Sequence, residues 1–413
     1  MTIPKNYVLG YKCINCATEY EVKPFIYQCT KCGENLDVQY DYLEIGKNWT
    51  KTTLQENTDR SIHRYLPLLP IQKAPENTTM QVGGTPLITF HDVQTETTKI
   101  DLFLKDDTRN PSGSLKDRAS EIGLLHADEL GADILVAAST GNAAASLAAL
   151  AAFHNKSAII LAPKSAPIAK LTQILQYGAK LFTVNGSYDD AFDLSLKIVD
   201  EYGLYSRSTG INPVLSEGKK TVILELLEQL QWDIPDKIFV PVGDGCIIGG
   251  AYKGLADLLS LGWIDHLPQL IAVQASGSSA IVDAIQYDRK IESVSANTIA
   301  DSISVDFPRD GLKAIRAIKK TNGSGVLVTD AEILEAQKLL SANSGIFAEP
   351  AAASAFAGFL KLNSSGKIKS GEKIAILITG SGLKDIQTAQ KQLSLPSLIE
   401  PTLEDFKRHN SDL

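Results

Sequence analysis

The stretch ILVAASTGNAAASLAALAAF, residues 134–153, decides the fold class of this chain. It opens with a short apolar run of the kind found in strands that are buried on both faces. It closes with an alanine-rich run, and alanine has the highest helix propensity of all residues. The short turn STGN, residues 139–142, joins the two runs. A buried strand that leads directly into a helix is typical of a parallel sheet with crossover helices.

The same alternation recurs along most of the chain. Short apolar or β-branched runs predict strands at 100–107, 157–163, 180–185, 237–243, 270–275 and 373–380. Runs with helical spacing lie at 168–178, 188–203 and 249–262. We therefore predict an α/β protein built on open parallel sheets. Residues 45–80 are polar and weakly periodic, and we expect a connector there.

The composition is that of an ordinary globular protein and argues against several classes of partner. The chain has 413 residues, too many for one simple core, with 44% hydrophobic and 21% charged residues. Its net charge of −8 disfavours nucleic acid and anionic membrane surfaces as partners. No apolar run reaches the roughly 18 residues of a membrane span. The start MTIPKNYVLGYKC lacks a hydrophobic signal core, so we expect a cytoplasmic protein.

Four cysteines are grouped near the start of the chain as two C-x2-C pairs separated by 12 residues: Cys13, Cys16, Cys29 and Cys32. In a cytoplasmic protein such spacing indicates metal binding rather than disulfides. Four thiolates can close a tetrahedral zinc site with no open position, so we predict a structural Zn²⁺ in a zinc-ribbon-like unit, residues 1–45. The alternative is a set of free thiols.

The loop NPSGSLKDRAS, residues 110–120, places Lys116 among small and polar residues where a helix begins. Lys116 could be a surface lysine that pairs with Asp117. It could instead be an amine that forms a Schiff base, held where its surroundings lower its pKa. The loop alone leaves both interpretations open.

Three glycine-containing turns follow predicted strands: STGN at 139–142, VGDGCIIGG at 242–250 and ITGSGLKD at 378–385. Open α/β sheets bind ligands at the carboxyl ends of their strands, and helix N-termini bind anions. None of the turns has the G-x-G-x-x-G or G-K-[ST] pattern of a nucleotide site. An amine, a carboxylate site and a phosphate cradle in one cleft suit pyridoxal phosphate.

From GGTPLI at 83–88 to TGSGLKD at 379–385, the chain resembles the fold-type II pyridoxal-phosphate enzymes, which are tryptophan synthase β-like. Within them it is most similar to the threonine synthases, a subset of which has a zinc-ribbon-like N-terminus. The resemblance implies two open parallel-sheet domains with the cofactor in the cleft between them. The expected boundaries are 46–125 with 205–413 for the large domain, and 126–204 for the small one.

The resemblance also implies roles for individual residues. Lys116 would carry the Schiff base and move protons at the substrate Cα, and Thr379 would contact the pyridine nitrogen. Asn142 would face the phenolic oxygen of the cofactor. The cofactor phosphate would lie against Gly243, Asp244, Gly245, Cys246 and Ile247. The substrate would be bound by Ser114, Ser139, Thr140, Gly141 and Asn142.

The substrate is the least determined part of the prediction. The first hypothesis is conversion of O-phosphohomoserine and water to threonine and phosphate. However, Leu215 stands where the family has a phosphate-binding arginine, and Asp244 stands where it usually has asparagine. Lys219, Lys220 or Arg207 could supply the missing charge.

Other functions are therefore kept open. One is a β-eliminating ammonia-lyase acting on serine or threonine, and another is a β- or γ-replacement enzyme for a different amino acid. A third is a non-catalytic relative, which the intact Lys116, Asn142 and Thr379 argue against. Enzymes of this type are often homodimers, so we also expect a homodimer.

Overall fold

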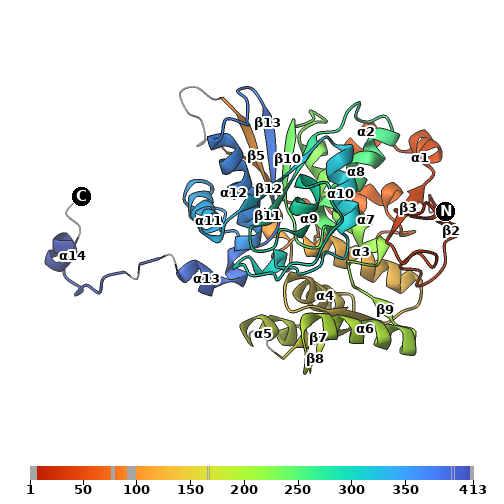
Figure 1. Ribbon diagram of the computed structural model, residues 1–413, viewed down its shortest axis with the longest axis horizontal. Coiled ribbons are helices and arrows are strands. Elements are labelled where there is room, and N and C mark those ends of the chain that lie inside the picture. Colours follow the sequence, from red (N-terminus) through yellow and green to blue (C-terminus); the bar gives the residue numbers. More distant parts are fainter. Residues whose placement is uncertain are drawn as a thin grey trace.

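The computed structural model describes residues 7–75, 80–90, 99–164, 166, 168–391, 393–394 and 396–409. Within these residues the chain forms three separate sheets (Figure 1). Two of them are the open sheets of an α/β protein, and the third is a small antiparallel sheet near the N-terminus. The predicted α/β class is confirmed.

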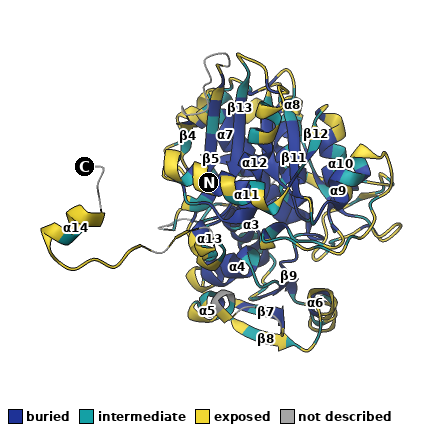
Figure 2. Ribbon diagram, turned by 60° about the vertical axis from the view of Figure 1, so that its left-hand side comes forward, coloured by how far each residue is buried: buried dark blue, intermediate teal, exposed yellow. Residues whose placement is uncertain are grey.

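The large sheet has six strands in the order β12-β11-β10-β13-β5-β4, and only β4 runs antiparallel to its neighbour. Alternate residues of β13 face opposite layers: Ile374 and Ile376 pack with α12, while Ala375 and Leu377 pack with α7 and α8. The sheet is therefore buried on both faces, as its dark strands in Figure 2 show. Its strands are β4 (Leu87–Phe90), β5 (Asp101–Asp106), β10 (Lys237–Pro241), β11 (Gln269–Ala275), β12 (Ser324–Val328) and β13 (Lys373–Ile378).

The small sheet lies below the large one in Figure 1 and has four parallel strands in the order β8-β7-β6-β9. The chain enters it after α3 (Lys116–Glu129) and leaves it into α7 (Pro213–Gln229). Its strands are β6 (Ile134–Ala138), β7 (Ser157–Pro163), β8 (Lys180–Val184) and β9 (Tyr205–Ser206), with helices α4 (Asn142–Phe153), α5 (Ile168–Gln176) and α6 (Tyr188–Tyr202). The exact domain boundaries near residues 45, 125 and 204 stay a prediction.

The third sheet consists of β1 (Val8–Cys13), β2 (Glu19–Tyr20) and β3 (Leu36–Tyr40). It docks on helices of the large layer through polar contacts. The Tyr40 hydroxyl donates to Glu217 of α7 at 2.9 Å, and the Asn35 amide donates to Asp310 at 2.7 Å.

The expected connector at 45–80 differs from the structure. It begins within α1 (Tyr42–Asn48) and contains α2 (Lys51–Gln55) and the 3-10 helix η1 (Ile62–Leu68). Side-chain caps from Asp41, Thr50 and Ser61 start these elements. Each is too short to give a clear apolar period, which is why the sequence pattern missed them.

The remaining elements cover the large sheet or follow it. They are η2 (Asp107–Arg109), α8 (Cys246–Ser260), α9 (Ala280–Gln286), η3 (Asp301–Ile303), α10 (Gly311–Lys320), α11 (Asp330–Ser344), α12 (Pro350–Ser364), η4 (Gly382–Lys384), α13 (Ile386–Gln390) and α14 (Leu403–His409). From α13 onward the chain leads away from the two sheets to α14 (Figure 1). In the described part of the chain, no helix has the length and apolarity needed to span a membrane.

Candidate active site

A cavity of about 480 Å³ opens where the carboxyl ends of strands from both parallel sheets converge. Lys116 lies in its wall, together with the turn after β6, the turn after β10 and Thr379 after β13. These segments come from four separate stretches of the chain. The prediction that the strand-end turns and the lysine loop share one cleft is confirmed.

The lysine loop is fixed by backbone hydrogen bonds to the turn after β13. Leu115 N donates to Thr379 O at 2.9 Å, and Ser381 N donates to Gly113 O at 2.9 Å. Ser114 forms a β-bridge with Gly380 between these two bonds. The loop and the turn therefore hold Lys116 and Thr379 at a set separation in the same cavity.

Lys116 does not pair with Asp117. The Asp117 carboxylate accepts hydrogen bonds from Ser112 N at 2.6 Å and from Ser112 Oγ at 2.5 Å, inside the lysine loop. Lys116 is half-buried in the cavity wall, and this burial lowers the pKa of its amine. The surface-pair interpretation is wrong, because Asp117 shapes the loop instead of neutralising the lysine.

The turn after β10 presents the N-terminus of α8 to the cavity. Gly245 has a φ of +92°, and a Cβ there would lie 2.7 Å from the carbonyl oxygen of Asp310, so only glycine fits. The first bond within the helix runs from Gly249 N to Gly245 O at 2.9 Å. The amides of Cys246, Ile247 and Ile248 therefore have no acceptor inside the helix and can bind an anion.

Asp244, the acidic residue of this turn, is directed at a neighbouring loop. Its Oδ1 accepts a hydrogen bond from Arg309 N at 3.2 Å, and its carbonyl accepts one from Asp310 N at 3.0 Å. Burial raises the pKa of its carboxyl group. The side chain thus serves to hold the 309–310 loop against the turn, which explains how a carboxylate is tolerated beside an anion site.

The turn after β6 presents a second helix N-terminus, that of α4. Gly141 caps the helix, and its carbonyl accepts the first intrahelical bonds from Ala144 N and Ala145 N, each at 3.1 Å. Ser139, Thr140 and Asn142 border the cavity beside these free amides. The site can therefore hold a carboxylate.

Asn142 makes contacts that the sequence did not predict. Its Nδ2 donates to Oε1 of Glu349 at 2.7 Å and to the Ser302 hydroxyl at 3.3 Å. Glu349 lies directly before α12 and also borders the cavity. In the sequence, Pro350 is the signal that a helix begins directly after Glu349, because proline is favoured at the first helical position.

One predicted residue lies apart from the rest. Ser114 is fully buried, is absent from the cavity wall, and its Oγ has no hydrogen-bond partner in the described part of the chain. The other predicted residues are brought together in the wall: Lys116, Ser139, Thr140, Gly141, Asn142, Gly243, Asp244, Gly245, Cys246, Ile247 and Thr379.

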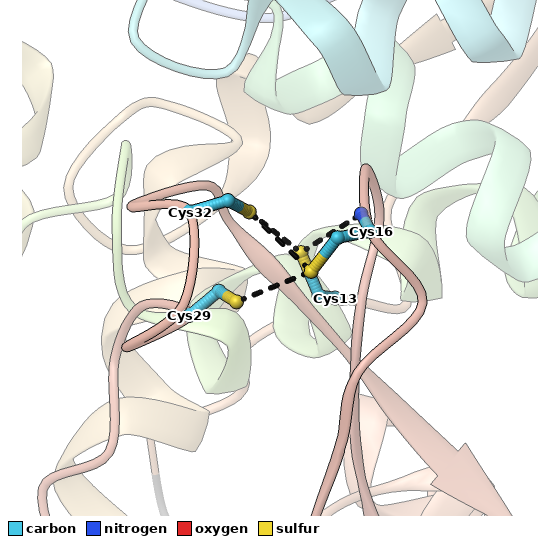
Figure 3. A group of neighbouring side chains, drawn as sticks. All are labelled: Cys13, Cys16, Cys29 and Cys32. Atoms are coloured by element: carbon cyan, nitrogen blue, oxygen red, sulfur yellow. Dashed lines mark hydrogen bonds between the residues drawn. The ribbon is translucent and has the colours of Figure 1, made fainter.

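The four cysteines of the N-terminal unit form a second cluster, shown in Figure 3: Cys13, Cys16, Cys29 and Cys32. All four sulfur atoms lie within 4.8 Å of one another, and the closest pairs are 3.5 Å apart. Zn–S bonds of about 2.3 Å in a tetrahedron place sulfur atoms roughly 3.8 Å apart. The cluster therefore fits a four-thiolate zinc site.

Comparison with known proteins identifies the class. The model of the pyridoxal-phosphate dependent enzyme family matches residues 78–380. The chain therefore belongs to this family. Solved structures with the same fold include a fungal L-serine ammonia-lyase from Rhizomucor miehei, with a TM-score of 0.64 and 22% identity, covering 75% of this chain and 98% of the other. The processed threonine deaminase isoform 2 from Solanum lycopersicum has a TM-score of 0.63 and 21% identity, covering 75% and 84%.

Within the family, relatives of this chain include several threonine synthases. The chain is 38% identical to threonine synthase from Methanocaldococcus jannaschii over 96% of this chain and 98% of that protein. It is 36% identical to the Methanosarcina acetivorans enzyme over 96% and 97%. The Mycobacterium leprae enzyme is 34% identical over 83% and 93%. The predicted resemblance to threonine synthases is confirmed.

Proposed function

We propose that this chain is a threonine synthase that converts O-phosphohomoserine and water to threonine and phosphate with bound pyridoxal phosphate. The observation that carries the proposal is the 38% identity to the Methanocaldococcus jannaschii threonine synthase over 96% of this chain. A match of that extent covers the cavity, both parallel sheets and most of the N-terminal unit.

The residues of the cavity fit the cofactor. Bound pyridoxal phosphate supplies an aldehyde for attachment to an amine and a conjugated ring that accepts the electron pair of a bond broken at Cα. Lys116 offers an amine in the cavity wall, and the amides at the start of α8 are donors for the phosphate. The cavity volume of about 480 Å³ is in the range of small-molecule sites.

Lys116 would act as the acid and base of the reaction. Burial lowers the pKa of its amine, which increases the fraction of neutral amine that can take a proton. After the amine has accepted the proton from Cα, it can return a proton to another carbon of the substrate. The hydrogen bond from Leu115 N to Thr379 O would keep the amine beside the bound substrate during both transfers.

Thr379 would set the direction of the chemistry. It lines the cavity and is 7% exposed, and its hydroxyl carries no charge. A carboxylate at this place would keep the pyridine nitrogen protonated, whereas a hydroxyl leaves it largely neutral. A neutral nitrogen favours elimination and replacement over transamination.

The α4 N-terminus would orient the substrate. Its free amides and the side chains of Ser139 and Thr140 would bind the substrate carboxylate, because a helix N-terminus favours a negative charge. Asn142 would lie beside the cofactor's phenolic oxygen. The carboxylate held at α4 and the amine at Lys116 together fix where Cα must lie.

Zinc would hold the N-terminal unit together. The four sulfur atoms within 4.8 Å of one another provide a complete tetrahedral set, so the ion would be structural rather than catalytic. We also propose a homodimer, on the resemblance to related enzymes.

Leu215 favours a second candidate, a β-eliminating ammonia-lyase acting on serine or threonine. Leu215 is fully buried, and its Cδ2 lies 2.6 Å from where a Cβ on Gly123 would be, so it packs against α3. It offers nothing to a substrate phosphate, and an ammonia-lyase needs no such pocket.

Product analysis of the purified holoenzyme tests both candidates. With O-phosphohomoserine, the proposal predicts equal amounts of threonine and inorganic phosphate. With threonine or serine, the ammonia-lyase predicts a 2-oxo acid and ammonia. Formation of a 2-oxo acid without phosphate release from O-phosphohomoserine would contradict the threonine synthase assignment.

A further inference from the structure

Two cations in the cavity wall, Arg207 and Lys219, form no ion pair with a carboxylate among the residues that the structure describes. Arg207 is 1% exposed and donates only to neutral groups, among them Thr209 Oγ1 at 2.8 Å and the Lys116 carbonyl at 3.3 Å. Lys219 is 0% exposed, and its Nζ has no hydrogen-bond partner in this part of the chain. A buried cation without a counter-charge is costly.

The neighbouring buried cation shows the ordinary arrangement. Lys220, the next residue of α7, pairs with Glu217 and, at 2.6 Å, with Asp257. Arg118 likewise pairs with Asp107 at 2.7 Å. Lys219 is equally buried and lacks such a partner, so an anion that enters the cavity could supply its missing counter-charge.

The carboxylates near the two cations are used elsewhere. Asp244 accepts from Arg309 N at 3.2 Å, and Glu349 accepts from Asn142 at 2.7 Å. Asp310 Oδ1 accepts from Asn35 at 2.7 Å, and Oδ2 has no hydrogen-bond partner in the described part of the chain. Asp310 acts on the Lys219 charge from a distance but forms no ion pair with it. None of these acids therefore neutralises the cationic wall by direct contact.

The titration behaviour of both groups agrees with this geometry. Burial lowers the pKa of Lys219 to about 8 and that of Arg207 to about 10. In contrast, the carboxylates around Lys253 raise the pKa of that buried lysine well above its ordinary value, despite the burial. A bound dianion would give Arg207 and Lys219 the compensation that Lys253 already has.

We propose that Arg207 and Lys219 bind a phosphate monoester dianion. The inference rests on the proposed function, in which two phosphates enter the cleft, one on the cofactor and one on the amino-acid substrate. The amides at the start of α8 already provide donors for one of them, so we expect the cationic pair to hold the substrate's phosphate. Lys219 would then supply the positive charge of the arginine that the family has in place of Leu215. Leu215 lies one turn before Lys219 on α7.

The test compares holoenzyme of the wild type with Lys219→Gln, Lys219→Met and Arg207→Gln. Lys197→Gln, an exposed lysine of α6, is the matched control. One arm measures the affinity of each loaded enzyme for inorganic phosphate by calorimetry, together with KM for O-phosphohomoserine. The other arm measures the dissociation constant of pyridoxal phosphate.

For Lys219→Gln we expect the phosphate dissociation constant and KM to rise about tenfold or more, the effect of losing a charge-assisted hydrogen bond. Pyridoxal phosphate affinity should stay as in the control. If cofactor affinity falls instead and inorganic phosphate binding is unchanged, the pair binds the cofactor's phosphate, which still supports the site. Unchanged values in both arms, for both residues, would overturn the proposal.

Melting temperatures show whether each variant is folded. Together with turnover, they also distinguish a failure of the phosphate site from a failure of the proposed reaction. Lys219→Met removes a buried charge that has no ion-pair partner. Without added inorganic phosphate, the holoenzyme of this variant should therefore melt no lower than that of the wild type. Inorganic phosphate should raise the melting temperature of the wild type but not of this variant. Phosphate binding that depends on Lys219, in a protein that releases no phosphate from O-phosphohomoserine, would keep the site and reject only the proposed reaction. Release of phosphate from O-phosphohomoserine, with phosphate binding that does not depend on Lys219, would support the proposed reaction and reject the site.

Discussion

Asn142 and Glu349 are joined across the cavity by a hydrogen bond of 2.7 Å from the asparagine Nδ2 to the glutamate Oε1. Asn142 begins α4 of the small sheet, and Glu349 precedes α12 of the large layer. Each residue is less than a tenth exposed. The bond fixes the amide of Asn142 on the cavity wall, which makes Glu349 a positioning residue for it.

Replacing Glu349 should therefore impair turnover without removing the cofactor. For Glu349→Ala we expect kcat/KM to fall roughly tenfold to a hundredfold, the range for losing a hydrogen bond to a charged group. Glu349→Gln keeps an acceptor oxygen and should retain most of the activity. Steady-state kinetics and cofactor absorbance check this, and equal activities for the two variants would contradict a positioning role.

The start of α3 is stabilised by a buried charge cluster. Arg118 lies 3.0 Å from Glu225, and Lys105 lies 2.5 Å from the same carboxylate. Glu225→Gln would leave two buried cations short of a counter-charge, at a cost of about 3–5 kcal/mol in unfolding free energy. Chemical denaturation of the holoenzyme measures the change, with the exposed Glu335→Gln as control. A loss no larger than that of the control would contradict this description of the cluster.

A second buried acid makes stability depend on pH. Glu121 lies 2.8 Å from Nε2 of His154 and 3.1 Å from Nε2 of His63. Burial alone would raise the pKa of Glu121, but the two histidines outweigh it and lower the pKa from 4.5 to about 2. The folded state therefore binds the proton more weakly than the unfolded chain, and the resulting stability is present above about pH 5 and lost as pH falls toward 2.

The contribution of Glu121 should be about 3 kcal/mol near neutral pH. Glu121→Gln should lower stability at pH 7 and flatten its decline between about pH 5 and pH 2. Thermal melts across this range test the prediction. A decline as steep in Glu121→Gln as in the wild type would assign the acid sensitivity to other groups.

Much of the fold is predictable from sequence because a strand buried on both faces is apolar at nearly every position, as β13 is from Ile374 to Ile378. The lysine loop and the glycine turns are also local patterns. The charge pattern of α7 is different: Lys219 and Lys220 are adjacent and chemically identical, yet only Lys220 has carboxylate partners. The difference between the two lysines depends on which helix packs against each face of α7. The contact of Glu349 with Asn142 likewise depends on tertiary packing. Neither feature can be predicted from the local sequence.

The cysteine unit should contain about one zinc ion per chain, because four thiolates complete a tetrahedral site. Replacing Cys29 and Cys32 by serine should remove the metal, as elemental analysis would show. The unit contacts Asp310 through Asn35, and Asp310 N donates to Asp244 O in the turn before α8. Metal loss should thus also weaken binding of pyridoxal phosphate. Full cofactor affinity in a zinc-free, folded variant would refute that connection.

The attachment of the cofactor to Lys116 is the claim on which the rest depends. The most direct measurement is borohydride reduction of the holoenzyme, followed by proteolysis and mass spectrometry of the labelled peptide. We predict a pyridoxyl group on Lys116, and loss of both the label and the visible absorbance near ~410–430 nm in Lys116→Ala. A label on Lys219, the other lysine of the cavity wall, or full activity in Lys116→Ala, would contradict the account.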